Sequence, residues 1–121
     1  MLPPTPSGAD PRTIGYWKNH QGHILDLITA NPIGTMTVAE IVDILRNSNA
    51  KDARNALRAQ GMATVLNLRD GTDSGGIVAT VIAARDFLIA HAGDPVKWKH
   101  PDRDEALDMK DLLDAYNNNG E

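Results

Sequence analysis

The sequence predicts an all-α protein, built as a small bundle or orthogonal array of about five helices. Three observations predict it. Apolar residues recur at helical spacing in several segments, and no segment of useful length alternates between apolar and polar residues as a half-buried strand does. Capping residues and glycine or proline stop signals separate these segments. The chain has 121 residues, which is enough for one domain with a core of its own.

The first eleven residues differ in composition from the rest, since four of them are proline. Such a stretch favours an extended linker or arm with little to bury. We therefore expect a Pro-rich arm over residues 1–11 and a single helical domain over residues 12–121. Met1 is followed directly by Leu2 and Pro3, without a charged region and a long apolar region, and we expect no signal peptide within this chain.

The first two predicted helices have clear end signals. One is expected at about residues 20–30 and ends at Asn31, because a residue before proline avoids the α conformation. The next begins with a capping box, in which the Thr37 hydroxyl accepts the Glu40 amide and the Glu40 side chain reaches back. Apolar residues then follow at i, i+3, i+4 and i+7, namely Val38, Ile41, Val42 and Leu45.

The third and fourth predicted helices carry the broadest apolar surfaces. The third, at about residues 51–68, is alanine-rich, and its small side chains let a neighbouring helix come close. Gly61 inside it costs about 1 kcal/mol relative to alanine. The fourth, at about residues 76–92, is expected to be the central helix because it has two adjacent apolar stripes. They are Ile77, Val81, Ala84 and Leu88, and beside them Val78, Ile82 and Ile89.

The fifth predicted helix follows a loop over residues 94–102 that contains Trp98. Asp102 is expected to cap this helix, with Glu105 at its third position. Its inward-facing residues are Ala106, Met109, Leu113 and Tyr116.

Charge and composition exclude several classes of function. The net charge is −4, and all of the excess acid lies in residues 94–121, so that no basic face for nucleic acid is visible. No apolar run approaches the length of a membrane span. Cysteine is absent, which excludes disulfides, thiolate metal sites and a cysteine nucleophile. The serines stand in linker or turn settings without a nucleophile-elbow pattern, and no phosphate-binding loop is present.

The segment over residues 13–20 reads Thr-Ile-Gly-Tyr-Trp-Lys-Asn-His. It resembles the opening signature of a family of helical domains in bacterial and archaeal secreted or surface proteins. The resemblance extends over about residues 12–118, through Thr37–Leu45, Val65–Asn67 and Leu112–Asn118. Family members often have a cysteine near this motif, which the chain lacks, and often His-Pro where it has His20-Gln21. The resemblance implies an exported setting and a domain spanning the chain. It implies no reaction, because the family has no established activity.

Three aromatic residues, Tyr16, Trp17 and Trp98, are the candidate ligand-contact residues. Exposed aromatic faces bind sugar rings, other aromatic groups or proline-rich segments. The alternative, which we favour for Tyr16 and Trp17, is that they clamp the N-terminal arm onto the bundle. With so few aromatic residues in the chain, the core needs them.

Four residues are candidate metal ligands: His20, His23, Asp70 and Asp73. Two histidines three residues apart lie on one side of a helix, but two ligands do not complete a site. The two aspartates resemble half of a calcium loop, yet the position that should hold glutamate is Val81. Capping and packing roles are the alternative for all four, with Asp73 or Ser74 as the cap of the helix that follows.

The resulting hypothesis is a non-enzymatic extracellular or cell-surface interaction or structural module of a larger secreted protein. It has a protein or glycan surface partner, and we expect no cofactor, no nucleic acid and no membrane span. One alternative is a small carbohydrate-active or hydrolytic domain that uses the Trp17 and Trp98 region. Another is a metal- or calcium-responsive assembly domain.

Overall fold

The computed structural model describes residues 10–49 and 51–119. Within them the chain is all-α, as predicted, with six helices and no β-strand. Most of the predicted Pro-rich arm lies outside the described residues. The helices are α1 (Ile14–Lys18), α2 (Gln21–Ala30), α3 (Val38–Arg46), α4 (Ala53–Arg69), α5 (Ile77–Ala90) and α6 (Arg103–Asn117).

The additional helix is α1, a short turn of helix over the segment that precedes the first predicted one. It forms because Thr13 caps it, with the Thr13 hydroxyl accepting a hydrogen bond from the Tyr16 amide at 3.2 Å. The predicted capping box at the start of α3 is confirmed: the Glu40 amide donates to the Thr37 hydroxyl and the Thr37 amide to the Glu40 carboxylate. No helix of the described residues is both long and apolar enough to cross a membrane.

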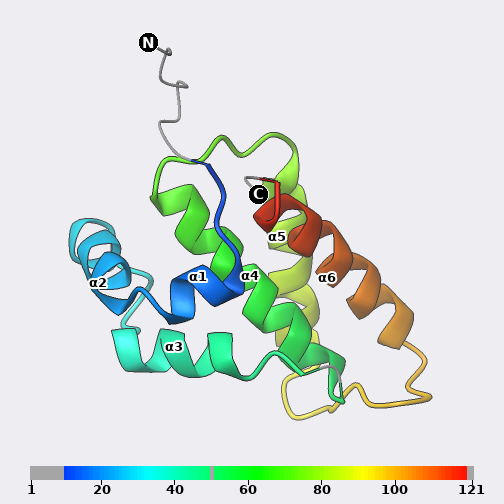
Figure 1. Cartoon of the computed structure of the whole chain (residues 1–121). Helices are drawn as coiled ribbons and strands as arrows, with labels where there is room; N and C mark the ends of the chain where they lie inside the picture. The colour runs from blue at the N-terminus through cyan, green and yellow to red at the C-terminus, as the bar shows by residue number, and fades with distance from the viewer. Residues whose placement is uncertain (1–9, 50, 120–121) are drawn as a thin grey trace.

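The central helix is α4, and the expectation that the fourth predicted helix, α5, is central was wrong. Every other helix contacts α4, whereas α5 packs mainly against α4 and α6 (Figure 1). The physical reason is the row of small residues in α4, among them Ala56, Ala59 and Ala63, which lets neighbours approach from several sides. Gly61 does not interrupt α4, which runs unbroken through it.

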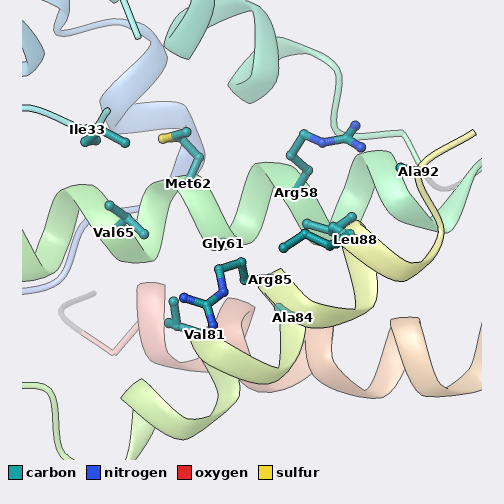
Figure 2. A pocket seen from close by; sticks show the side chains of 11 residues that line it. Ile33, Arg58, Gly61, Met62, Val65, Val81, Ala84, Arg85, Leu88 and Ala92 are labelled. Atoms are coloured by element: carbon teal, nitrogen blue, oxygen red, sulfur yellow. The ribbon is translucent and has the colours of Figure 1, made fainter. Parts of the chain in front are cut away.

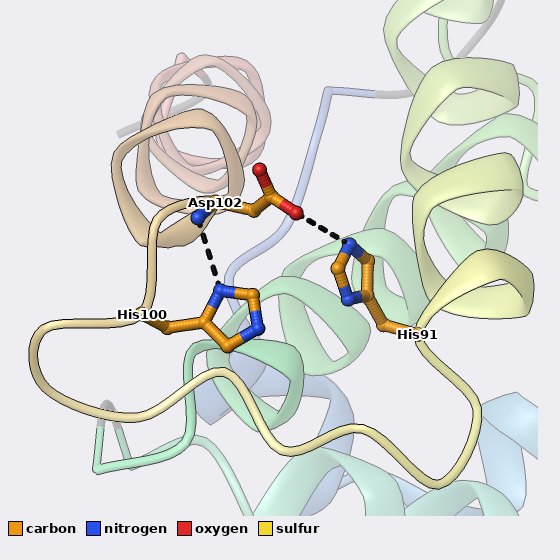
Figure 3. Close-up of side chains that lie close together, drawn as sticks. All are labelled: His91, His100 and Asp102. Atoms are coloured by element: carbon orange, nitrogen blue, oxygen red, sulfur yellow. Dashed lines mark hydrogen bonds and ion pairs between the residues drawn. The ribbon is translucent and has the colours of Figure 1, made fainter.

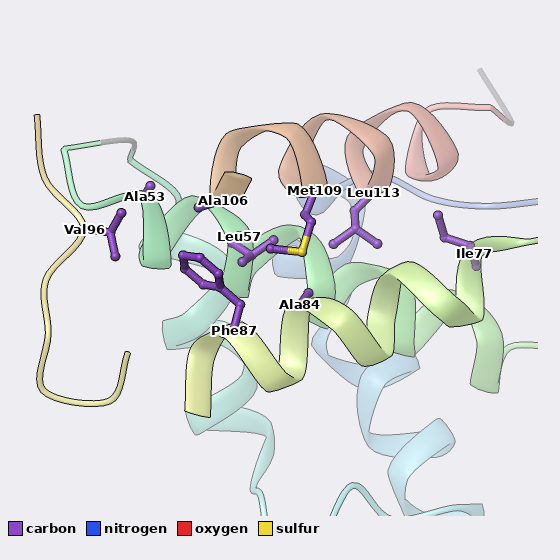
Figure 4. Packing of buried hydrophobic residues seen from close by; sticks show 9 residues of the cluster. All are labelled: Ala53, Leu57, Ile77, Ala84, Phe87, Val96, Ala106, Met109 and Leu113. Atoms are coloured by element: carbon purple, nitrogen blue, oxygen red, sulfur yellow. The ribbon is translucent and has the colours of Figure 1, made fainter. Parts of the chain in front are cut away.

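Two hydrophobic clusters fill the interior on different sides of α4. The first, between α4, α5 and α6, is shown in Figure 4 and contains Ala53, Leu57, Ile77, Ala84, Phe87, Val96, Ala106, Met109 and Leu113. The second joins α4 to the first three helices and contains Trp17, Ile24, Ile41, Val42, Leu45, Ala63 and Leu66. Only one of the two apolar stripes of α5 enters a cluster, and the other remains on the surface.

Candidate functional site

The segment over residues 13–20 contributes to a buried hydrogen-bonded contact, called here the joint, in which Arg12, Trp17 and Asn117 meet at Asn67. The side chain of Trp17 is fully buried, and its indole Nε1 donates to Asn67 Oδ1 at 3.0 Å. Asn67 also binds the backbone amide and carbonyl of Arg12 and donates to Asn117 Oδ1 at 2.9 Å. All four hydrogen-bonding capacities of its amide are therefore used. Trp17 offers no surface to a ligand, and it does not line the hollow beside the exposed Trp98.

Two of the predicted metal ligands, His23 and Asp70, meet beside this joint. His23 Nε2 lies 3.0 Å from Asp70 Oδ1, and His23 Nδ1 lies 2.8 Å from the Tyr16 hydroxyl. Both nitrogens of the ring are thus occupied. His20 does not join them, because its ring stacks on Tyr16 at 3.8 Å between centroids and its Nδ1 bonds the Tyr16 carbonyl. Asp70, His23 and Tyr16 therefore form a hydrogen-bonded chain of side chains.

The remaining predicted residues stand apart. Asp73 is exposed, and its carboxylate accepts a bond from the Gly75 amide at 3.3 Å. It does not cap α5, whose N-cap is Gly76 without a side-chain bond. Trp98 is 77% exposed and borders a shallow hollow of about 360 Å³ with Arg103 and Leu107.

A groove lies between α4 and α5, and it was not predicted from the sequence. It has a volume of about 440 Å³ (Figure 2). Its apolar walls come from α4, α5, the loop before α3 and the segment just after α5, and comprise Ile33, Met62, Val65, Val81, Ala84, Leu88, Ile89 and Ala92. Two guanidinium-bearing residues, Arg58 and Arg85, line it as well, and no acidic residue does. Of the second apolar stripe of α5 only Ile89 lines the groove, so that the stripe by itself could not have located it.

Gly61 lies in this groove and is unusual for its position. Apart from its chain neighbours and the backbone of its own helix, a methyl group placed on its α-carbon would meet no atom of the described residues within 4 Å. Packing within the protein therefore does not require glycine here, although glycine in a helix interior costs about 1 kcal/mol relative to alanine.

A group of side chains able to hold a metal ion occurs in the segment between α5 and α6. His91, His100 and Asp102 each present a ligand atom, and these atoms lie within 4.8 Å of one another (Figure 3). Among the described residues this is the one such group of three. Asp102 was expected to cap α6 but makes no side-chain cap, because its carboxylate contacts His91 Nε2 at 3.2 Å instead. Hydrogen bonds from His91 and His100 lower the pKa of the neighbouring Asp94 carboxyl.

In comparisons of the chain with protein-family models, with curated proteins and with solved structures, nothing matched. The function must therefore be argued from the groove and the side-chain clusters themselves.

Proposed function

We propose that the chain is a non-enzymatic interaction module that binds an acidic, amphipathic helix of a partner protein in the groove between α4 and α5. The observation that carries the proposal is Gly61. Its missing side chain leaves the floor of the groove open, and no side chain among residues 10–49 and 51–119 fills that space. A glycine at a helix surface allows a second backbone to approach closely.

The apolar surface continues beyond the groove along α5. Val78, Ile82 and Ile89 are 44%, 45% and 66% exposed, and they repeat at helical spacing on its outer side. A helix of 14 residues is about 21 Å long, so that the surface is elongated rather than compact. This shape suits a helix laid alongside α5 better than a small molecule, which binds in an enclosed pocket.

The charge of the groove favours an acidic partner over a second copy of this chain. Arg85 pairs with Asp86 at 3.2 Å, but both side chains are well exposed and such a pair contributes little. Arg58 makes a long bond of 3.3 Å to Asn55. A carboxylate of a partner can therefore bind either guanidinium. Pairing of two identical grooves would instead bring arginines face to face.

The proposed setting is outside the cell or at its surface, as part of a larger secreted protein. The resemblance of residues 12–118 to helical domains of secreted and surface proteins supports it, and so does the composition of residues 1–11, which is typical of a linker.

The test is binding of a designed helical peptide as long as α5, with leucine along one face and glutamate on its flanks, followed by NMR chemical-shift changes. Shifts are expected at Gly61, Leu88 and Ile89. Ile89→Asp is expected to weaken binding about tenfold or more, because it removes an apolar contact and repels the glutamates. Leu25→Asp is the matched control, since Leu25 is similarly exposed on α2.

Two further peptides make the outcome decisive. A peptide with the same composition but no apolar face and a peptide with lysine in place of glutamate are both expected to bind at least tenfold more weakly. Equal binding of all three peptides, or shifts that centre on Trp98 instead of the groove, would contradict the proposal.

A further inference from the structure

We propose that His91, His100 and Asp102 form a binding site for a divalent transition-metal ion such as Zn²⁺, in which Asp94 orients both imidazole rings. The site joins the end of α5 to the start of α6 and does not depend on the groove between α4 and α5. Two imidazoles and one carboxylate are a donor set that zinc accepts in proteins.

Asp94 fixes which nitrogen of each ring carries a proton. Its Oδ2 lies 2.7 Å from His91 Nδ1 and 3.2 Å from His100 Nε2. A carboxylate accepts hydrogen bonds, so both of these nitrogens donate to it. In neutral rings, His91 Nε2 and His100 Nδ1 are then left with lone pairs. In metal sites, a carboxylate commonly accepts the N–H of one ligating histidine and so orients its ring. Here the single carboxylate of Asp94 would orient two rings.

Both lone-pair nitrogens lie on the side of Asp102 (Figure 3). His91 Nε2 is 3.2 Å from Asp102 Oδ2, and His100 Nδ1 accepts the Asp102 backbone amide at 3.0 Å. A cation between this lone-pair nitrogen of His91 and the carboxylate oxygen would bind both. The geometry thus suits a positive charge at this point.

The separations require only small movements for coordination. One ligand atom from each of the three residues lies within 4.8 Å of the other two, whereas bonds of about 2.1 Å to a tetrahedral zinc place ligand atoms about 3.4 Å apart. Coordination by His100 Nδ1 would replace the hydrogen bond that this nitrogen accepts from the Asp102 amide. Three protein ligands leave a fourth position for water or for a group of a partner.

The rings are held by the rest of the fold. The side chains of His91 and His100 are only 12% and 17% exposed. The His91 ring lies against the Phe87 ring, with centroids 4.2 Å apart. The backbone carbonyl of His91 accepts a hydrogen bond of 2.8 Å from the Arg54 side chain. Ligands fixed before binding lose little freedom on taking up the ion, which favours affinity.

The test is titration of the purified chain with ZnCl₂ by calorimetry and with Co²⁺ by visible absorption. One ion per chain with micromolar or tighter affinity, and the intense absorption of four-coordinate Co²⁺, are expected. Asp102→Asn and His91→Gln are expected to abolish both signals. Asp94→Asn is expected to weaken affinity roughly 10–100-fold while the stoichiometry remains one, because it acts through the histidines.

His20→Gln is the matched control, since His20 is an exposed histidine that precedes α2 and is not one of the proposed ligands. This variant is expected to bind Zn²⁺ as the wild type does. Circular dichroism of each variant shows whether it is folded, and Asp102→Asn keeps the shape of the side chain. No binding by the wild type, or unchanged binding by folded Asp102→Asn and His91→Gln, would overturn the proposal.

Discussion

The two ends of α4 fasten the chain in chemically different ways. At the C-terminal end, Asn67 holds Arg12, Trp17 and Asn117 through an uncharged amide. At the N-terminal end, Asp52 holds the segment after α5 through a carboxylate, which accepts bonds from the Arg54 side chain at 2.8 Å and from the Val96 amide at 3.1 Å.

The difference decides how each end responds to its surroundings. The amide of Asn67 does not titrate, and one of its four hydrogen bonds is made with the buried Trp17. The C-terminal end of α4 therefore depends on packing and on satisfied polar groups. The N-terminal end depends on an ion pair, because the bond from Arg54 lowers the pKa of Asp52 to about 2. We therefore expect the first end to be sensitive to the loss of volume and the second to pH.

The largest effect is expected at the amide end. Trp17→Ala removes a fully buried aromatic side chain and leaves Asn67 Oδ1 with one donor fewer. It should lower the free energy of unfolding by about 3–5 kcal/mol. Equilibrium urea unfolding measures this loss.

Trp98→Ala is the matched control, because that side chain is 77% exposed and its removal should change stability by no more than about 0.5 kcal/mol. A change below about 1 kcal/mol for Trp17→Ala would mean that the joint at Asn67 is not what holds this end.

An intermediate effect is expected at the carboxylate end and depends on pH. The folded pKa of Asp52, about 2, lies below its ordinary value of 3.8, so that the ionised carboxylate stabilises the fold above about pH 4. This contribution, about 2 kcal/mol, is lost as the pH falls from about 4 towards 2. Acid unfolding of the wild type and of Asp52→Asn measures the difference, which should shrink through that range.

Asp86→Asn serves as the comparison for that experiment, since Asp86 also pairs with a neighbouring arginine but is well exposed. Its stability should remain parallel to that of the wild type down to pH 2. If the free energy of unfolding of Asp52→Asn also follows that of the wild type at every pH, the ion pair does not stabilise the contact between α4 and the segment after α5.

The smallest effect is expected between the two ends, at Gly61. Gly61→Ala should raise the free energy of unfolding by about 1 kcal/mol, because the new methyl group meets nothing and alanine favours a helix. Thermal unfolding measures the gain.

Gly93→Ala is the contrasting variant: its surroundings are equally open, but its φ of 80° is strained for alanine. It should lose stability where Gly61→Ala gains it. A loss at Gly61 would show that the glycine is needed by the chain itself, and would remove the main support for a docking surface.

Helical spacing and capping could be predicted from the sequence because both depend on residues that are close together in the chain. The capping box at Thr37 and the apolar repeat that follows it concern residues within two turns of each other, and the structure has both. The short helix α1 was missed because, besides its local cap at Thr13, it is held by Trp17, which packs against residues far along the chain. Sequence spacing also brought out His23 and Asp70 but not the contact between them, which spans 47 positions.

The sequence by itself determined the helical class, most helix positions and the presence of more apolar surface on residues 76–92 than a single contact face needs. Only the tertiary structure decided that α4 is central, that one stripe of α5 stays exposed, and that His91 meets His100 and Asp102. The reason is that periodicity states which side of a helix is apolar but not what covers it. Likewise, an irregular loop gives its histidines no repeating spacing, so that their meeting depends on how α5 and α6 are placed against α4.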